Sequence, residues 1–369
     1  MKVLQLLPAL DSGGVEQGTV DVARGLHEAG HQALVMSAGG RLVGALQDAG
    51  ARHLSLDIGA KSPLTLRHVL SLSRLLAREQ VDILHLRSRM PAWIGYLAWR
   101  LMPASERPRL VSTIHGFYSV SRYSAVMTRG ERIICVSHAV RRYLQESYPE
   151  VDASRIVVIH RGVDREQFPH GFTPQPSWLQ DWERAWPRWP GTRTLLLPGR
   201  ITRLKGHHAF LDLIHDLRGG GDAVRGFIAG GEDPRRKRYA NELREAIIRR
   251  DLTQHVHMLG HRDDLREIMS VSDLVLSLSS KPESFGRTTL EALSLGRPTL
   301  GFEHGGVGEI LHELYPAGAV SSMQRKDLLA RTRELLQAPP PVPAAHGFSR
   351  RAMVVQTLEV YQSLLGSPS

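Results

Sequence analysis

The sequence predicts an α/β protein with two doubly wound parallel sheets, each covered by helices on both faces. Three observations lead to this class. The chain has 369 residues, 42% of them hydrophobic and 23% charged, which suits two globular domains and excludes a disordered chain. Short apolar runs alternate with segments of helical periodicity. The same alternation occurs twice, on either side of a segment rich in proline and tryptophan.

The elements follow from these runs in order. In the first half, buried strands are expected at 2–7, 33–36, 81–86, 110–114, 132–136 and 156–159, and helices at 16–29, 66–79 and 138–147. In the second half, strands are expected at 194–198, 225–229, 256–259, 273–278 and 298–302, and helices near 206–218, 236–250, 263–271 and 287–295.

The domain boundaries are set by proline-rich stretches. We expect a first domain at 1–170 and a second at 171–347, joined by a segment that carries a short helix around 177–186. Prolines at 338–343 are expected to end the last helix of the second domain. The segment 348–369, with a helix at 349–365, is then expected to cross back to the first domain.

Composition limits the function classes. The single cysteine, Cys135, excludes an intramolecular disulfide and a multi-cysteine zinc site. The sequence holds no apolar run long enough to span a membrane, and the initial apolar stretch is too short for a signal peptide, so we expect a cytoplasmic protein. The net charge is +10, and residues 61–109 hold nine basic and three acidic residues beside Trp93, Tyr96 and Trp99.

That basic segment has two readings which the sequence leaves open. It could contact an anionic membrane surface or a phosphate-bearing partner, or it could be a solvated basic face. We expect no nucleic-acid partner, because no recognition module of the known kinds is present.

The strongest chemical signal is P-E-S-F-G-R-T-T-L-E-A-L at 282–293, directly after a predicted strand. Glu283 lies at the strand's carboxyl end, where parallel sheets bind ligands, and Gly286 lies in the turn. Glu291 lies one turn inside the next helix, whose N-terminus favours phosphate. Glu291 could accept the hydroxyls of a ribose and Glu283 those of a sugar. The alternatives are a helix-surface ion pair with a turn residue, or the carboxylate pair of a glycosidase.

A second motif argues against a glycosidase. Arg200 and Lys205 flank a short loop between a strand and a helix, in LLLPGRITRLKGHH. Two fixed cations at this edge suit a diphosphate leaving group, whose charge develops as the glycosidic bond breaks. A glycosidase has no evident use for them.

Two weaker signals lie in the first half. Gly13 and Gly14 occupy the first strand–helix turn, where the backbone could approach a ligand, although G-x-G-x-x-G and P-loop patterns are absent. His115 follows a strand directly, and could bind a sugar hydroxyl or be a satisfied core histidine. No histidine cluster and no D-x-D pair suggests a metal site.

Together these motifs resemble a known family, the retaining glycosyltransferases of the GT-B fold, family 4. The resemblance rests on GGVE (13–16), TIHG (113–116), VSHAVRRYL (136–144), RGVDREQF (161–168), GRITRLKG (199–206), GHRDDLREIMSVSDLVLSLS (260–279), E-x7-E (283–291) and GGVGEI (305–310). The family usually has N-G-V-D where this chain has Arg161-Gly162-Val163-Asp164 after His160, so the asparagine is absent.

The resemblance implies two Rossmann-like domains with a nucleotide-sugar in the cleft and the last helix crossing back. It implies that Arg200 and Lys205 bind the diphosphate, that Gly13 and Gly14 approach it, and that Glu291 holds the ribose. The donor sugar would contact Glu283, His115 and the backbone of Phe285 and Gly286. The loop of Gly260, His261 and Arg262 would meet the base. The leaving diphosphate would help to deprotonate the acceptor, with retention of anomeric configuration and without a metal or other cofactor.

The stretch HLRSRMPAW (85–93) resembles a subgroup of lipopolysaccharide and surface-polysaccharide assembly. Arg87 and Arg89 are expected on the acceptor side, where they would meet phosphates of a glycan or lipid-linked acceptor. The donor would be a UDP-sugar or a GDP-sugar. Two alternatives remain: a nucleotide-sugar epimerase of the same architecture, and a non-catalytic protein that binds sugar nucleotides or polyanions.

Overall fold

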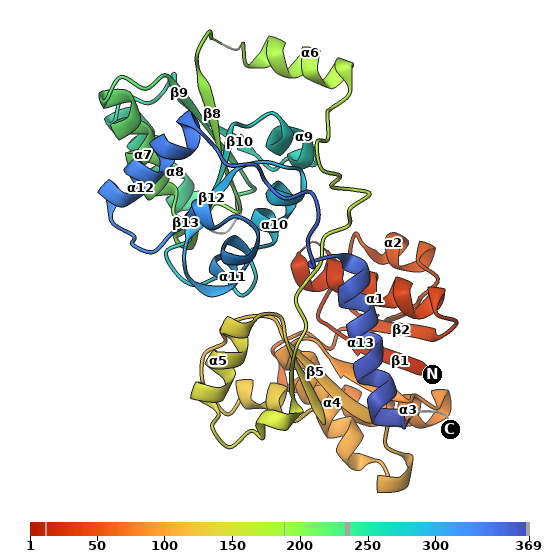
Figure 1. Cartoon of the computed structure of the whole chain (residues 1–369). Coiled ribbons are helices and arrows are strands. Elements are labelled where there is room, and N and C mark those ends of the chain that lie inside the picture. Colours follow the sequence, from red (N-terminus) through yellow and green to blue (C-terminus); the bar gives the residue numbers. More distant parts are fainter. Residues whose placement is uncertain (12, 188, 233–236, 367–369) are drawn as a thin grey trace. The chain divides into compact units, whose positions relative to one another are not determined.

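The computed structural model describes residues 1–11, 13–187, 189–232 and 237–366 (Figure 1). It divides into two compact units: residues 1–162 with 348–369, and residues 163–347. The division lies eight residues before the expected boundary at 170. The reason is that residues 163–171 bond to the second unit, as in the 3.1 Å hydrogen bonds from Gly171 N to Leu295 O and from Arg266 Nη1 to Gln167 O.

The first unit contains a parallel sheet in the order β3-β2-β1-β4-β5-β6-β7. Its strands are β1 (Lys2–Leu6), β2 (Gln32–Ser37), β3 (Arg52–Ser55), β4 (Ile83–Leu86), β5 (Arg109–Ile114), β6 (Arg132–Cys135) and β7 (Ile156–Val158). Its helices are α1 (Gly14–Glu28), α2 (Val43–Asp48), α3 (His68–Glu79), α4 (Arg89–Leu101), α5 (His138–Ser147) and α13 (Arg350–Leu365).

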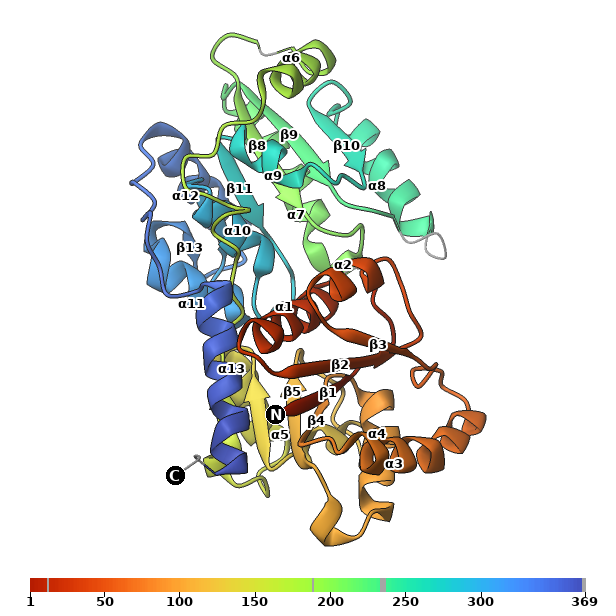
Figure 2. The same cartoon turned by 90° about the vertical axis from the view of Figure 1, so that its right-hand side faces the viewer.

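Alternating strand residues divide the first core into two layers. Leu4 and Leu6 pack against α3, α4 and α5, whereas Val3 packs on the other face with α1, α2 and α13. Figure 2 shows α3 and α4 on one side of this sheet and α1 and α2 on the other. The sheet is therefore covered on both faces, as the apolar runs predict.

The last helix, α13, packs on the first unit. At Gly25 of α1, a side chain would meet Val354 of α13, since an ideal Cβ would lie 2.1 Å from its Cγ1. The fully buried Tyr361 places its hydroxyl 2.7 Å from Nδ1 of His85 in β4. These contacts join the C-terminal helix to the first sheet.

The second unit contains a parallel sheet in the order β10-β9-β8-β11-β12-β13. Its strands are β8 (Arg193–Pro198), β9 (Val224–Ala229), β10 (Val256–Gly260), β11 (Leu274–Ser277), β12 (Thr299–Phe302) and β13 (Ala319–Val320). Its helices are α6 (Pro176–Ala185), α7 (His207–Gly219), α8 (Lys237–Arg249), α9 (Leu265–Ser270), α10 (Arg287–Ser294), α11 (Gly305–Leu314) and α12 (Arg325–Gln337).

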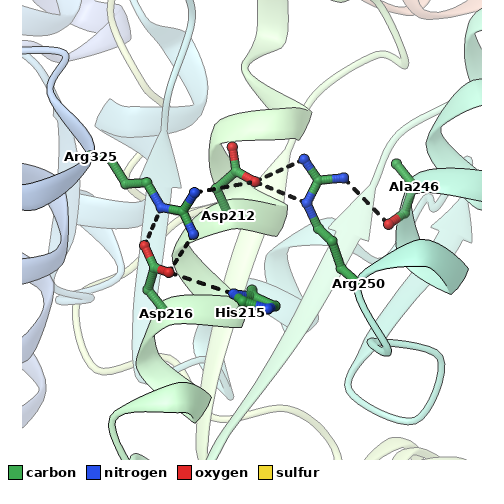
Figure 3. Close-up of polar contacts among 6 residues, drawn as sticks. All are labelled: Asp212, His215, Asp216, Ala246, Arg250 and Arg325. Atoms are coloured by element: carbon green, nitrogen blue, oxygen red, sulfur yellow. Dashed lines mark hydrogen bonds and ion pairs between the residues drawn. The ribbon is translucent and has the colours of Figure 1, made fainter.

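An ion-pair network joins three segments on the surface of the second unit (Figure 3). The guanidinium of Arg325 at the start of α12 bonds both carboxylate oxygens of Asp216 in α7. Asp212, one turn earlier, lies 2.8 Å from Nη2 of Arg250, the residue that follows α8. The network therefore links α7 to α12 and to the end of α8.

Every expected strand is present in both units, but some elements appear that the sequence analysis did not identify. These are β3, α2, α4, α11 and β13. The helix α4 also changes the interpretation of the aromatic residues in the basic segment. Trp93 and Trp99 are half-buried against the core and donate their indole N–H to the backbone oxygens of Tyr123 and Pro108. They are thus packed inward rather than displayed for a membrane.

Within the described part of the chain, no helix is both long and apolar enough to cross a lipid bilayer.

Candidate functional site

The second sheet reverses its strand order between β8 and β11. From β8 the chain winds to β9 and β10 in one direction, and from β11 it winds to β12 and β13 in the other. Ligands of open parallel sheets bind at the carboxyl ends of the strands at such a point. Arg200 and Lys205 follow β8, and Glu283 follows β11. The residues singled out in the sequence thus flank the switch point.

Lys205 and Glu283 are in direct contact. The Lys205 ammonium lies 2.7 Å from Oε1 of Glu283, and the Ser279 hydroxyl donates to the same oxygen. Both charged side chains are about three-quarters buried, with 26% and 21% of their surface exposed. Their loops meet closely at Gly206, where φ is 75° and a Cβ would lie 1.9 Å from the carbonyl oxygen of Leu278. Only glycine fits this conformation and this approach.

Arg200 has a different environment from Lys205. Its side chain is exposed and has no hydrogen-bond or ion-pair partner among the residues that the structure describes. The preceding Gly199 has a φ of 142°, and Lys205 packs its methylene groups against it. Lys205 is thus paired with Glu283, whereas the guanidinium of Arg200 is available to a ligand.

The loop of Glu283 is held against the N-terminus of α11. Gly306 N donates to Glu283 O over 2.8 Å, and an ideal Cβ at Gly306 would lie 2.3 Å from Cα of the buried Phe285. Gly286, with a φ of 94°, then begins α10. The N-termini of α10 and α11 are therefore both close to the Glu283 loop, where their backbone N–H groups favour an anion.

Glu291 is buried, with only 7% of its surface exposed. Its Oε1 accepts a 2.7 Å hydrogen bond from Nε of Arg287, one turn earlier in α10. Burial raises the pKa of Glu291, and the Arg287 charge opposes that rise. The pair is a helical i,i+4 pair, as one alternative expected, in which Arg287 is 40% exposed and Glu291 is buried. Its role toward a ribose stays a prediction.

In the loop after β10, the two basic side chains, His261 and Arg262, have different environments. Arg262 is bound to Asp264 by hydrogen bonds of 2.7 and 2.5 Å, and Asp264 also accepts from the Trp178 indole of α6. His261 is 61% exposed and lies 3.2 Å from Asp263. Gly260, with a φ of 69°, makes the turn. Of the residues expected to meet a base, His261 is open, whereas Arg262 is engaged.

The first sheet reverses between β1 and β4. Gly13 and Gly14 follow β1 and begin α1, with φ of 154° at Gly13. Arg87 follows β4 directly, as expected, but its side chain is only 4% exposed and Nη1 donates to Oε1 of Gln5 over 3.0 Å. Burial lowers the pKa of Arg87 to about 10.

Arg89 does not share this environment. It begins α4, donates to the Ser124 hydroxyl over 3.2 Å, and lies over the Tyr118 ring at 4.8 Å. The acceptor-side role expected of Arg87 and Arg89 stays a prediction, but the two side chains differ in their exposure. Arg87 is an interior residue because β4 directs its side chain under α1, and only Arg89 is partly accessible.

His115 follows β5 and contacts a residue that the sequence analysis did not assign to the site. Arg161 Nη2 lies 2.7 Å from Nδ1 of His115, and Arg161 Nη1 donates to the carbonyl oxygen of Gly14. The signal was present, since Arg161 stands in the motif that departs from the family pattern. Ser279 was also missed; its position at the end of an apolar run gave no distinct signal.

Comparison with known proteins identifies the family of the chain. A family model described as Glycosyltransferase Family 4 matches residues 12–167, and one described as Glycosyl transferases group 1 matches residues 180–352. A putative glycosyltransferase YtcC of Bacillus subtilis is 26% identical over 226 residues, which are 57% of this chain and 54% of that protein. The chain thus spans about half the length of that relative.

Solved structures match the whole chain. A glycosyltransferase of Rickettsia africae has a TM-score of 0.83 and 26% identity, with 100% of this chain and 99% of that chain covered. The Anabaena protein Alr3699/HepE, solved in complex with UDP and glucose, has a TM-score of 0.80 and 21% identity, with coverage of 98% and 100%. Each unit is thus a Rossmann-like domain, and the fold is GT-B. The chain belongs to the group 1 glycosyltransferases, with an N-terminal domain of the family 4 type.

Proposed function

We propose that this protein is a retaining glycosyltransferase that moves a hexose-type sugar from a nucleotide-diphosphate sugar to a phosphate-bearing glycan or lipid-linked acceptor. The observation that carries the proposal is the Lys205–Glu283 pair beside the available Arg200 at the switch point of the second sheet. Two cations and a carboxylate at one strand edge suit a ligand that combines a diphosphate with sugar hydroxyls.

The proposed chemistry gives each residue a role. Arg200 and Lys205 neutralise the diphosphate as the bond to the anomeric carbon breaks. Glu283 accepts a hydroxyl of the donor sugar, and Lys205 and Ser279 fix the position of its carboxylate. The departing diphosphate takes the acceptor proton on the same face, so that configuration is retained without a metal.

A UDP-sugar is the favoured donor and a GDP-sugar the alternative. The support comes from the Anabaena protein of the same fold, whose structure has been solved with UDP-glucose. Glu291 would hold the ribose, and His261, with its exposed ring, is available to the base.

For the acceptor, the first unit supplies Arg89. It also carries an exposed surface that we call the leucine surface: Leu64, Leu66 and Leu70, with Lys61, Arg67 and Arg74. The three leucines are 71%, 49% and 60% exposed, and the three basic residues are exposed beside them. No acidic residue occurs between positions 58 and 78. Exposed apolar side chains that alternate along the sequence with cations fit an anionic membrane surface. We therefore propose peripheral contact with the cytoplasmic face of a membrane and an acceptor of the lipopolysaccharide-core type.

Thermal stability in the presence of nucleotides tests the proposal. UDP, GDP, ADP and CMP are compared, each with EDTA and with magnesium. A ligand at a hundred times its Kd adds about 2.7 kcal/mol. We expect a metal-independent shift with UDP that disappears in Arg200→Ala, while Arg203→Ala, an exposed neighbour bonded to Glu242, retains it. No shift with any nucleotide would contradict the proposal.

Product analysis separates transfer from the alternatives. Incubation with a UDP-hexose and a phosphorylated glycan should give a new glycoside of unchanged anomeric configuration by NMR. Conversion of the donor sugar without an acceptor would show an epimerase. Nucleotide binding without either product, across a panel of acceptors, would show a binding protein.

A further inference from the structure

The contact between Arg161 and His115 determines where the imidazole carries its hydrogen. Nη2 of Arg161 lies 2.7 Å from Nδ1 of His115. A guanidinium has only N–H donors and no acceptor, and it stays protonated in proteins. Nδ1 must therefore accept this hydrogen bond, and it carries no hydrogen of its own. In the neutral ring the hydrogen is then on Nε2.

Burial and neighbouring charges keep the imidazole ring of His115 neutral. Burial lowers the pKa of His115 well below its usual value, and the nearby charges of Arg161 and Arg87 act in the same direction. His85 is itself bonded to Tyr361 and Thr113, and its pKa is also lowered by burial. The Tyr118 hydroxyl accepts a 3.3 Å hydrogen bond from the backbone N–H of His115. The carboxylates of Glu16 and Asp21 act on Arg87, whose pKa they raise against the effect of burial.

The other ring nitrogen, Nε2, has no partner among the described residues. Nε2 of His115 is buried and makes no hydrogen bond with any residue that the structure describes. An unsatisfied buried donor is costly, and in native proteins such a group usually serves a ligand or an ordered water. Arg161 is held from its other side by the Gly14 carbonyl at the start of α1, so its orientation toward His115 is fixed twice.

We propose that Arg161 is a positioning residue that makes His115 an obligate hydrogen-bond donor, whose Nε2–H is reserved for an oxygen atom of the ligand. The ligand oxygen is a sugar hydroxyl or a phosphate oxygen. His115 then does not act as a general base. Its Nε2 already carries a hydrogen, and the lone pair of its Nδ1 accepts the hydrogen bond from Arg161. The identity of the ligand rests on the proposed function; the tautomer does not.

Arg161 places a positive charge beside His115, and this charge affects the protonation of the ring. The resemblance stated above leads us to expect asparagine at the position where this chain has Arg161. An amide would be neutral, whereas the guanidinium brings a permanent positive charge next to the ring. That charge excludes the doubly protonated imidazolium, in which Nδ1 would also be a donor and the two groups would repel.

Histidine NMR on the full-length protein tests the tautomer without any substrate. With ¹⁵N- and ¹³C-labelled histidine, the His115 signals are assigned as those missing from His115→Gln. We expect the Nε2–H tautomer and no titration between pH 5.5 and about 8.5. In Arg161→Met the ring should titrate with a higher pKa and lose its fixed tautomer, and Arg161→Lys, which keeps a donor and a charge, should restore the wild-type signals. An Nδ1–H tautomer or ordinary titration in the wild type would overturn the proposal.

Adding ligands to the labelled protein shows which ligand oxygen His115 contacts. Addition of UDP-glucose should shift the Nε2–H signal; a shift with UDP alone assigns a phosphate oxygen, and one that needs the hexose assigns a hydroxyl. In transfer assays, His115→Gln, whose amide reaches the Nε2 position, should retain about tenfold more activity than His115→Asn, whose amide reaches only the Nδ1 position. Equal activity of the two variants would contradict the donor role. Absence of any transfer would count against the proposed function and leave the NMR result intact.

Discussion

Lys205 and Glu283 form a 2.7 Å ion pair across 78 residues of sequence. The pair joins the loop after β8 to the loop after β11, the two strands between which the second sheet reverses its winding. Neither loop alone would define a site. Their contact depends on Gly206, which lets one loop lie directly on the carbonyl of Leu278 in the other.

Ser279 should matter for activity through Glu283. Its hydroxyl donates to the same carboxylate oxygen as Lys205, so Ser279→Ala removes one of two bonds that orient Glu283. We expect about a tenfold loss of kcat/KM, the equivalent of one hydrogen bond to a charged group. Steady-state transfer assays check this, with Ser280→Ala as control, because Ser280 is exposed and bonds Leu204 only through its backbone. An equal loss in both variants would refute a specific role.

Arg325 should contribute modestly to the stability of the second unit, and only above acidic pH. It lowers the pKa of Asp216, so Asp216 ionises more readily in the folded chain than in the unfolded one. The stabilisation is therefore present above the unfolded value near 3.8 and is lost as pH falls through the lower folded value. Because Arg325 is half-exposed, solvent screening limits the loss in Arg325→Ala to about 0.5 kcal/mol at pH 7.

Urea unfolding at pH 7 and pH 3 measures this difference. Lys326→Ala is the control, because Lys326 is the exposed neighbour in α12 and bonds none of the described residues. A difference between Arg325→Ala and wild type that persists undiminished at pH 3 would show that packing, rather than the ion pair, carries the effect.

The sequence was sufficient to predict both sheets because buried parallel strands form continuous apolar runs, and such runs need no partner to be recognised. It also placed Glu283 and Lys205 at strand ends. It did not predict β3, which is only partly buried, or the interior position of Arg87, because an arginine beside a basic helix gives no sign of whether it faces solvent. Arg161 was visible as an anomaly, but its contact with His115 spans 46 residues and requires the folded sheet.

The leucine surface should govern binding to anionic vesicles. Leu64, Leu66 and Leu70 are exposed, and burial of three such side chains in the interface outweighs the loss of their mobility. Changing all three to serine should weaken binding to phosphatidylglycerol-containing vesicles about a hundredfold. Flotation assays check this, with Ile248→Ser as control, since Ile248 is 66% exposed on α8 of the other unit. Equal binding of wild type and the triple variant would contradict this surface.

Tyr361 should anchor α13 to the first sheet. Its buried hydroxyl lies 2.7 Å from Nδ1 of the fully buried His85, whose Nε2 lies 2.6 Å from the Thr113 hydroxyl. In Tyr361→Phe, Nδ1 is left buried without its partner, and an unsatisfied buried polar atom costs about 1–3 kcal/mol.

Chemical unfolding measures this loss of stability, and native-state hydrogen exchange in α13 and β4 shows which segments it affects. The control is Val355→Ser on the same helix, whose side chain is 46% exposed and which should change stability by less than about 0.5 kcal/mol. If Tyr361→Phe destabilises α13 and β4 together, the helix is a structural part of the first unit, as its burial against β4 requires. Faster exchange in α13 alone, with the sheet unchanged, would mean that the helix can leave without disturbing His85, and the anchoring role would fail.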